Sequence, residues 1–562
     1  MLHRYLCTGV LVLGAMFITV VRTSPLVAQQ NTLNRQYDAI VVENLQPFVG
    51  LTISELAAYH YTIATDAWTQ IPFQVDEVAA GKFFVEQKGT IDNDDEICFM
   101  ARDAGDRAGV DKWLNDPGAR QNPRIEVEVA DPLNPGQAGW IYVYRKLGTQ
   151  PPVPAGYLTY VPDASGVGAD TIKGRSYVAA HALNGWPNYA TIVTENGSSA
   201  NLLDRQKTRA KGVATVPILG SVPYELTEDN GLQYVSDRFG GGAVRGLREL
   251  RIGVAVPLLG TLLPIDTVAF VTQYFAYSNT LGAKDAKIDS AIAELAGVSL
   301  IRQSMDLNAN VLGQNMRFYD AFNTGGVSID GNIDRPDSTV LGNELNWMMA
   351  TGQPGAILVL ITVPPIGSER WLYYRDNSAG GTGDGTVETG DGKSYGDFGI
   401  RITGTKIQGQ FSFDLTTFFL DPSVVANPVE TGTQFKSRAA SPANVTATEQ
   451  SFTTSVADQE DSPNVFALYE AYPNPFSPAK EPVRLALNLG ASVKSAGLHI
   501  YNLLGQEVAR FTTANGLAAT TGRQEIAWNG KDFSGRNLPA GIYFYRLQAG
   551  DQVAVKKFVL VR

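Results

Sequence analysis

Short apolar runs separated by turn-forming residues recur along almost the whole chain, and this pattern limits what the chain can fold into. Apolar and polar residues alternate at residues 125–129 and 140–144, as they do in strands that bury one face. The 562 residues include 56 glycines and 29 prolines, which divide these runs. The sequence therefore predicts a mainly β protein: a large β-sandwich-type body of one or two units with few helices, then a linker and a small C-terminal β-sandwich.

Two stretches of the body have the apolar spacing of helices instead. Ile288, Ile292 and Leu295 share one face over residues 285–296. A shorter helical pattern covers about residues 341–350. We expect these to be the few helices of the body.

Composition divides the chain into segments. Residues 421–465 are rich in Ala, Ser, Thr, Pro and Val and have almost no aromatics, which predicts an extended linker. Before it, we place a boundary near residue 160, which gives an N-terminal β-rich domain at 29–160 and a larger β-rich domain at 161–420. One large two-sheet sandwich would produce much the same pattern.

The C-terminal segment, residues 466–562, combines short β-type runs with several distinctive motifs. The runs lie about 8–12 residues apart, with Gly, Asn and Pro between them. The motif residues are Tyr472, Pro473, Asn474, Pro475, Phe476, Gly505, Trp528, Gly541, Tyr543, Lys556 and Lys557. In this order they resemble the type A C-terminal sorting domain of proteins exported by the type IX secretion system. They also resemble the related immunoglobulin-like domain of the flagellar-hook capping family.

The resemblance covers under a fifth of the chain. It implies an immunoglobulin-like sandwich that carries a sorting signal, and the type IX secretion machinery as its partner. It also implies export across a Gram-negative outer membrane, after which the domain is usually removed and the rest is anchored or released. Lys556 and Lys557 would be recognition points, or charges that protect an edge strand from pairing.

The first 28 residues have the features of a signal peptide. His3 and Arg4 precede an apolar stretch of 16 residues at 6–21, and a small-residue cleavage site ends at Ala28. A membrane span needs about 20 residues, and we find no later stretch of that length. We therefore expect a mature chain without a transmembrane anchor, secreted or held on the outer-membrane cell surface of a Gram-negative bacterium.

Charge and cysteine content narrow the function further. Without residues 1–28 the net charge changes from −11 to −13, because 43 basic residues face 56 acidic ones. Nucleic-acid binders normally have a basic domain, so we expect no nucleic-acid partner. Cys98 is then the single cysteine, and the apolar residues around it predict a buried thiol and no internal disulfide.

A glycine-rich loop at residues 373–397 is a candidate calcium site. Its carboxylates are Asp376, Asp384, Glu388, Asp391 and Asp397. Carboxylates and backbone carbonyls on a flexible loop suit Ca²⁺, which takes about 6–8 oxygen ligands. Ca²⁺ is thus the one cofactor that the sequence indicates. A solvated, turn-rich loop would have the same composition.

Two further patterns point to a carbohydrate ligand, each with a plainer alternative. Arg205, Lys207, Arg209 and Lys211 alternate with uncharged residues, so on a strand their side chains would share one face. That face would form a groove for an anionic polysaccharide, or an exposed edge strand protected by charge. Trp186 lies with Tyr189 in a turn-rich loop, where the two rings would stack on sugars or belong to the core.

These features favour a secreted or cell-surface protein whose body binds extracellular carbohydrate. The alternative is a polysaccharide lyase or glycoside hydrolase on a β-sandwich. A lyase needs a cation to neutralise a uronate and a Tyr, Lys or His as the base. His181 beside Arg205, Lys207 or Arg209 is the candidate catalytic group. A surface adhesin or structural protein without a small ligand is the third alternative.

Overall fold

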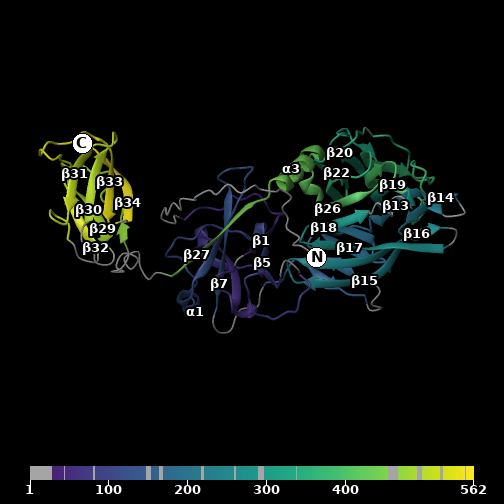
Figure 1. Ribbon diagram of the computed structural model, residues 1–562, viewed down its shortest axis with the longest axis horizontal. Coiled ribbons are helices and arrows are strands. Elements are labelled where there is room, and N and C mark those ends of the chain that lie inside the picture. Colours follow the sequence, from purple (N-terminus) through teal and green to yellow (C-terminus); the bar gives the residue numbers. More distant parts are fainter. Residues whose placement is uncertain are drawn as a thin grey trace. The chain divides into compact units, whose positions relative to one another are not determined.

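The structure is a computed structural model that describes residues 28–43, 45–79, 83–146, 154–163, 169–216, 220–258, 261–288, 296–336, 338–452, 466–489, 496–518, 523–550 and 552–561. The chain divides into two compact units, a body that ends at Ser451 and a C-terminal unit that begins at Phe452. Strands are the main secondary structure of both (Figure 1), which confirms the predicted mainly β fold. The predicted signal peptide lies, but for its last residue, outside the described residues.

Two antiparallel sheets form the N-terminal part of the body. One has the order β1-β5-β4, with β1 (Ala39–Glu43), β4 (Gln74–Asp76) and β5 (Glu96–Met100). The other has the order β27-β6-β7-β2-β3, with β2 (Leu56–Thr62), β3 (Ala67–Gln70), β6 (Arg124–Ala130), β7 (Ala138–Arg145) and β27 (Asn444–Gln450). Apolar residues of both sheets, such as Val42, Phe99 and Val127, share one core.

Three further sheets form the rest of the body. The first has the order β12-β11-β10-β9-β8, with β8 (Thr159–Val161), β9 (Thr171–Lys173), β10 (Tyr177–His181), β11 (Pro187–Thr194) and β12 (Gly197–Ser198). The second has the order β14-β13-β19-β25-β24, with β13 (Leu203–Val216), β14 (Gly220–Thr227), β19 (Val298–Leu307), β24 (Glu369–Asn377) and β25 (Ser394–Thr403).

The third sheet has nine strands in the order β15-β16-β17-β18-β26-β23-β22-β20-β21. Its strands are β15 (Leu232–Gly241), β16 (Gly246–Leu258), β17 (Thr261–Tyr274), β18 (Ser278–Ile288), β20 (Arg317–Asp320), β21 (Val327–Ser328), β22 (Leu345–Gly352), β23 (Gly355–Thr362) and β26 (Gly409–Leu420). Single 3-10 turns occur at Ile53–Glu55, Ile63–Thr65, Ala101–Asp103, Ala309–Val311 and Pro422–Val424.

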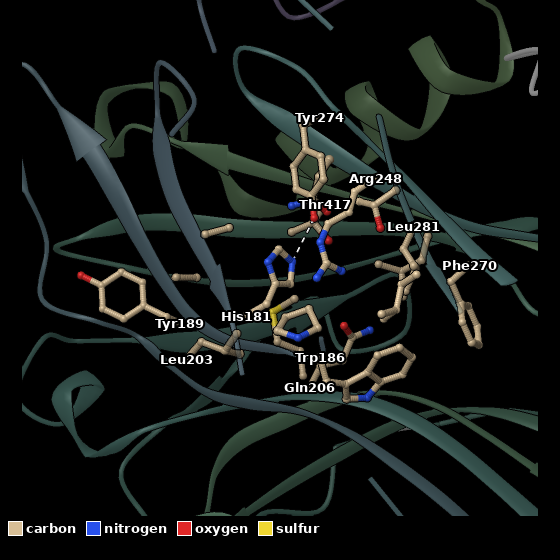
Figure 2. A pocket seen from close by; sticks show the side chains of 18 of the residues that line it. His181, Trp186, Tyr189, Leu203, Gln206, Arg248, Phe270, Tyr274, Leu281 and Thr417 are labelled. Atoms are coloured by element: carbon tan, nitrogen blue, oxygen red, sulfur yellow. Dashed lines mark hydrogen bonds between the residues drawn. The ribbon is translucent and has the colours of Figure 1, made fainter. Parts of the chain in front are cut away.

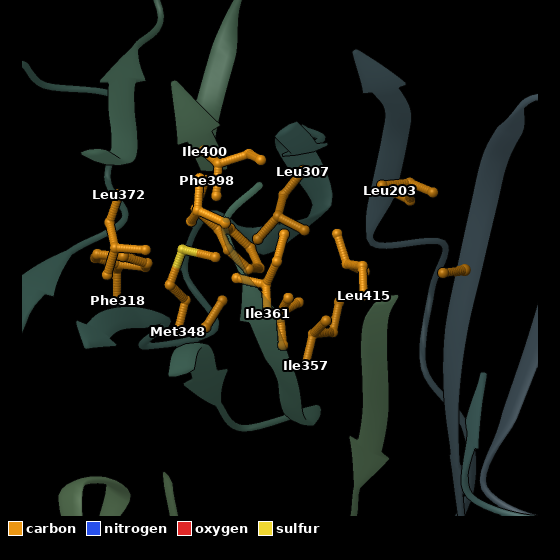
Figure 3. Packing of buried hydrophobic residues seen from close by; sticks show 14 of the residues in the cluster. Leu203, Leu307, Phe318, Met348, Ile357, Ile361, Leu372, Phe398, Ile400 and Leu415 are labelled. Carbon is orange, nitrogen blue, oxygen red and sulfur yellow. The ribbon is translucent and has the colours of Figure 1, made fainter. Parts of the chain in front are cut away.

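The main core of the body lies between the nine-stranded sheet and the sheet that contains β19 and β25 (Figure 3). β23 shows how it is built. Ile357 and Ile361 point into this core, whereas Leu358 and Leu360 pack on the other face, in a cluster with Phe435 of helix α3 (Pro428–Ala440). A strand buried on both faces has a continuous apolar sequence, as β23 does.

The C-terminal unit is a two-sheet sandwich. One sheet has the order β28-β29-β32, with β28 (Phe466–Leu468), β29 (Val483–Leu489) and β32 (Arg523–Trp528). The other has the order β31-β30-β33-β34, with β30 (Ala496–Asn502), β31 (Glu507–Thr512), β33 (Gly541–Ala549) and β34 (Gln552–Leu560). Inward side chains of both sheets, among them Leu485, Ile500 and Tyr545, form one core.

The helix prediction at 341–350 is wrong, and the one at 285–296 is wrong over residues 285–288, whereas Ala296 is helical. Residues 285–288 belong to β18, where Ala286 is opposite Phe411 of β26, and residues 289–295 lie outside the described part. Residues 345–350 belong to β22, whose Trp347, Met348 and Met349 are all buried. A short, fully buried apolar run does not reveal by its periodicity whether it is helix or strand.

The predicted linker is folded over residues 422–450. Asn427 caps helix α3 by accepting a hydrogen bond from the Glu430 backbone N–H at 3.3 Å, with Pro428 in the first turn. β27 then pairs along β6, from Asn444 opposite Ala130 to Gln450 opposite Arg124. The side chains of β27 are mostly exposed and polar. Backbone pairing with β6 holds the strand in the sheet, so the composition of this segment does not predict a strand. Residues 453–465 lie outside the described part.

No described helix is long and apolar enough to cross a membrane. Helix α1 (Pro117–Gln121) spans five residues.

Candidate functional site

A cavity of about 50 Å³ opens in the body beside His181, the histidine that the sequence singles out (Figure 2). Strands of the nine-stranded sheet and of the two five-stranded sheets that contain β10 and β13 contribute to it. Its polar and aromatic lining includes His181, Trp186, Tyr189, Gln206, Arg248 and Tyr274.

Four side chains beside the cavity form a chain of hydrogen bonds. The Tyr274 hydroxyl lies 3.0 Å from Nε2 of His181, and Nδ1 of His181 lies 2.5 Å from a carboxylate oxygen of Asp170. Nε of Arg248 donates to the other oxygen of Asp170 at 2.9 Å. All of these bonds are satisfied at once if neutral His181 donates from Nδ1 and accepts from the tyrosine.

The electrostatics of this chain agree with that assignment. Burial lowers the pKa of His181, and the Arg248 charge lowers it further, so the imidazole stays neutral. Burial raises the pKa of Asp170, but hydrogen bonds and charge from His181 and Arg248 prevail and lower it to about 2. Burial raises the pKa of Tyr274, so the phenol keeps its proton. The chain therefore consists of two neutral rings, Tyr274 and His181, followed by one anion and one cation.

This arrangement is poorly suited to the chemistry of a lyase. Arg248 already contacts Asp237 at 3.1 Å and the Gly185 carbonyl at 3.2 Å, besides Asp170. Its guanidinium is thus occupied and is not free to neutralise a uronate. A cavity of about 50 Å³ has room for a few waters, whereas about 150 Å³ accommodates benzene. The geometry is that of a buried, ion-paired polar network.

We predict that this network makes the stability of the body depend on pH. The pKa of His181 is lower in the folded state than its unfolded value of about 6.5. The unfolded state therefore binds the proton first as the pH falls, so the free energy of unfolding should decrease below about pH 6.5. Denaturant unfolding at several pH values should show a smaller decrease for His181→Gln. Identical pH profiles for both proteins would contradict this assignment.

The cation stripe, formed by Arg205, Lys207, Arg209 and Lys211, lies on β13 but is covered by other residues. Lys207 and Arg209 are fully buried. β13 lies between β14 and β19, so the predicted exposed edge strand is wrong. The loop at residues 378–393 covers the stripe: Lys207 contacts Glu388 at 2.7 Å, and Lys211 donates to the Gly385 carbonyl at 2.6 Å. The stripe therefore forms no open groove in the described part of the body.

The rest of the stripe is also neutralised. Arg209 is paired with Glu228, and Arg205 contacts Asp229 at 2.9 Å. Neither cation lies with His181, whose described partners are Asp170, Arg248 and Tyr274. Sequence reasoning missed these three, although Arg248 and Tyr274 are polar groups within largely apolar runs, which is a readable signal of a buried network.

Most of the five predicted calcium ligands are bound to protein cations. Glu388 contacts Lys207, and Asp384 and Asp397 lie 3.3 and 3.9 Å from Arg302. Asp391 is exposed and accepts a hydrogen bond from the Lys393 backbone N–H at 2.9 Å. The five do not converge on one point: Asp376 lies with Asp330 and Asp334, whereas Asp391 lies with Asp204 and Asp306.

The two aromatic candidates have different surroundings. Trp186 is buried, packs against Leu250 and Phe270, and donates from Nε1 to the Thr208 hydroxyl at 3.2 Å. It is therefore a core residue, not a sugar-stacking platform. Tyr189 is 37% exposed and borders the cavity, so its ring remains reachable.

In the C-terminal unit, the motif aromatics build the core. Phe476 and Trp528 are buried, with ring centroids 5.9 Å apart, and both contact Phe558 of β34. Tyr543 stacks on Phe558 as well, and its hydroxyl donates to the Pro539 carbonyl at 2.8 Å. These motif residues stabilise the sandwich and do not present a surface.

The remaining motif residues fix the backbone or lie at the surface. The Asn474 side chain accepts a hydrogen bond from the Val559 N–H at 2.9 Å, which holds the segment with Pro473 and Pro475 beside β34. Gly505 has a φ of 78°, a conformation that favours glycine. The outward-facing members are Tyr472, Gly541, Lys556, which pairs with Glu470, and Lys557.

Comparison with known proteins identifies part of this unit. The model of the FlgD Ig-like domain family matches residues 475–552, so the C-terminal domain is immunoglobulin-like. No curated protein matches the chain. Similar solved structures include PorZ of Porphyromonas gingivalis, described as an essential surface component of the type-IX secretion system. That match has 13% identity and a TM-score of 0.13, and it covers 69% of this chain and 50% of PorZ.

A second solved structure is the ectodomain of the Caenorhabditis elegans fusion protein EFF-1. It has 7% identity and a TM-score of 0.12 and covers 95% of this chain and 94% of that one. The chain thus spans half the length of PorZ, and neither TM-score is high enough to bear on fold or function.

Proposed function

We propose that this chain is a secreted or cell-surface protein exported through the type IX secretion system, with its immunoglobulin-like domain as the sorting signal. The observation that carries the proposal is the match of residues 475–552 to the FlgD Ig-like family. The motif order of Phe476, Trp528 and Tyr543 in the core of that domain supports it.

The burial of these motif residues has a consequence for recognition. Side chains with almost no exposed surface cannot touch a partner directly, so the secretion machinery would bind the folded domain rather than a linear peptide. Exposed apolar residues at its turns are available for such contact. They are Leu503 (70% exposed), Leu504 (83% exposed) and Phe533 (63% exposed).

The export proposal can be tested with a fusion. Residues 466–562, joined to a periplasmic reporter protein in a bacterium that has the type IX machinery, should bring the reporter to the cell surface. Whole-cell protease digestion would measure this. A fusion that remains periplasmic while folded would contradict the proposal.

For the body, carbohydrate binding remains our proposed activity, now centred on Tyr189 at the rim of the cavity. Its partly exposed ring can stack on a sugar, while Asn279 and Gln206 lie nearby in the lining. The cleavage alternative has less support because Arg248 is already paired. An adhesin without a small ligand would leave Tyr189 without a role. Binding of residues 29–452 to a polysaccharide panel, and its loss in Tyr189→Ala, would distinguish the two.

A further inference from the structure

Three carboxylates meet where the edges of two sheets come together. Asp330 and Asp334 follow β21, the last strand of the nine-stranded sheet, and Asp376 lies in β24, the last strand of its five-stranded neighbour. Each offers an oxygen atom, and these atoms all lie within 4.8 Å of one another. Two ligands of one cation with bonds of about 2.4 Å can be at most that far apart.

Asp376 is built into this position. The register of β24 against β25 shifts between Arg375 and Asn377, so Tyr395 and Gly396 of β25 form a bulge opposite Asp376. The residue is 0% exposed. One of its carboxylate oxygens accepts hydrogen bonds from the backbone N–H groups of Asp330 and Gly331, at 2.7 and 2.8 Å.

The other carboxylate oxygen of Asp376 is buried and has no hydrogen-bond partner in the described part of the chain. A buried carboxylate oxygen without a partner is costly unless a cation or a proton compensates it. The Tyr374 hydroxyl is likewise buried and has no hydrogen-bond partner among the described groups. Burial raises its pKa, and the negative charges of all three aspartates raise it further. The three carboxylates are thus accompanied by two buried oxygen atoms, one of Asp376 and one of Tyr374, that have no described hydrogen-bond partner.

Among the described residues, no protein cation forms an ion pair with these three carboxylates. Burial first, and then the charges of Asp330 and Asp334, raise the pKa of Asp376 to about 6. Arg317 acts on Asp334 but donates its own hydrogen bonds to Ser328 and to the carbonyls of Gly325 and Gly326.

A second acidic cluster provides the contrast. Asp204, Asp306 and Asp391 also lie within 4.8 Å of one another. There, however, the Lys207 ammonium contacts Asp306 at 2.6 Å. A resident ammonium group already supplies the positive charge, so that cluster does not require a metal ion.

We propose that Asp330, Asp334 and Asp376 bind one Ca²⁺ ion, which joins the edges of the two sheets. Three carboxylates from two segments suit Ca²⁺, whose coordination is flexible and all-oxygen, better than Mg²⁺, which keeps several waters and uses one or two carboxylates. Backbone carbonyls and water would complete the shell. Binding would then stabilise the body, because the unfolded chain does not hold these residues together.

Terbium luminescence and calorimetry on the full-length chain test this site. Tb³⁺ replaces Ca²⁺ at oxygen sites and is excited by a nearby tyrosine, here Tyr374. We expect tyrosine-sensitised emission that CaCl₂ competes away, and an increase in the melting temperature on addition of CaCl₂. Asp376→Asn, which removes the buried charge with little change of shape, should weaken Ca²⁺ binding by at least about ten-fold. The half-exposed Asp334→Asn should weaken it as well.

Asp391→Asn is the matched control, since it removes an acid of the other cluster and should leave Ca²⁺ binding unchanged. Tyr374→Phe should reduce the terbium emission while calorimetry still detects Ca²⁺. The proposal would be overturned by an absence of Ca²⁺ binding, by equal affinity in Asp376→Asn and wild type, or by MgCl₂ binding as tightly as CaCl₂. None of these results depends on how the chain is exported or on what its body recognises.

Discussion

Replacing Lys207 by methionine should lower the free energy of unfolding of the body by about 3–5 kcal/mol. The ammonium group is fully buried and contacts Asp306 at 2.6 Å and Glu388 at 2.7 Å. Burial lowers the pKa of Lys207, but the charges of Asp397, Asp306 and Glu388 outweigh it and raise the pKa, so the group stays charged. Methionine fills much the same volume but leaves these buried carboxylates without their cation.

Lys211→Met is the control for that prediction. Lys211 lies four residues along the same strand and the same face, but its ammonium is half-exposed and donates to one backbone carbonyl, that of Gly385. We expect a loss of at most about 1 kcal/mol. Denaturant unfolding of both variants provides the comparison. Equal losses in the two would mean that the buried network around Lys207 contributes no more than a surface contact.

Replacing Trp528 by alanine should have a similarly large effect on the C-terminal domain. The indole is buried among Phe476, Tyr543 and Phe558. Removing a buried tryptophan costs about 3–5 kcal/mol. Domains of this size are stable by only about 5–15 kcal/mol. The variant should therefore populate unfolded forms of the domain, and its delivery to the cell surface should fall in proportion.

Phe533→Ala tests whether this effect is specific to the core. Phe533 is an aromatic residue of the same domain but is 63% exposed. Its removal should change stability by no more than about 0.5 kcal/mol. Chemical denaturation and surface protease digestion on the same two variants connect stability to export. Normal surface delivery of an unfolded Trp528→Ala domain would show that a linear signal is sufficient.

The sequence predicts the strands well and the contacts of their side chains poorly. Alternation at Arg205, Lys207 and Arg209 correctly places these residues on one face of a strand. It does not reveal what covers that face. The covering acid, Glu388, comes 181 residues after Lys207. The stripe and the acidic loop thus look like two separate binding sites in the sequence, while in the fold they neutralise each other.

The same limit explains the missed calcium ligands and the misread linker. Asp376 is identifiable as a candidate ligand, but its partners Asp330 and Asp334 come from another sheet edge. The spacing of residues along the sequence cannot show that these three carboxylates lie close together in the fold. In the predicted linker, Asn427 and Pro428 are a recognisable signal for the start of a helix. The prediction of an extended linker instead followed the low aromatic content of the segment. Trp186 does lie in a loop, as predicted, but the strands that bury it, β16 and β17, are distant in sequence.

The most direct test of the export proposal is truncation of the chain after Asn464. The truncated protein keeps every described element of the body, including α3 and β27, and lacks the immunoglobulin-like domain. Produced in a bacterium with the type IX machinery, it should accumulate folded in the periplasm and be protected from protease added to whole cells. If the truncated body reaches the cell surface as efficiently as the full-length chain, the C-terminal domain is not its sorting signal.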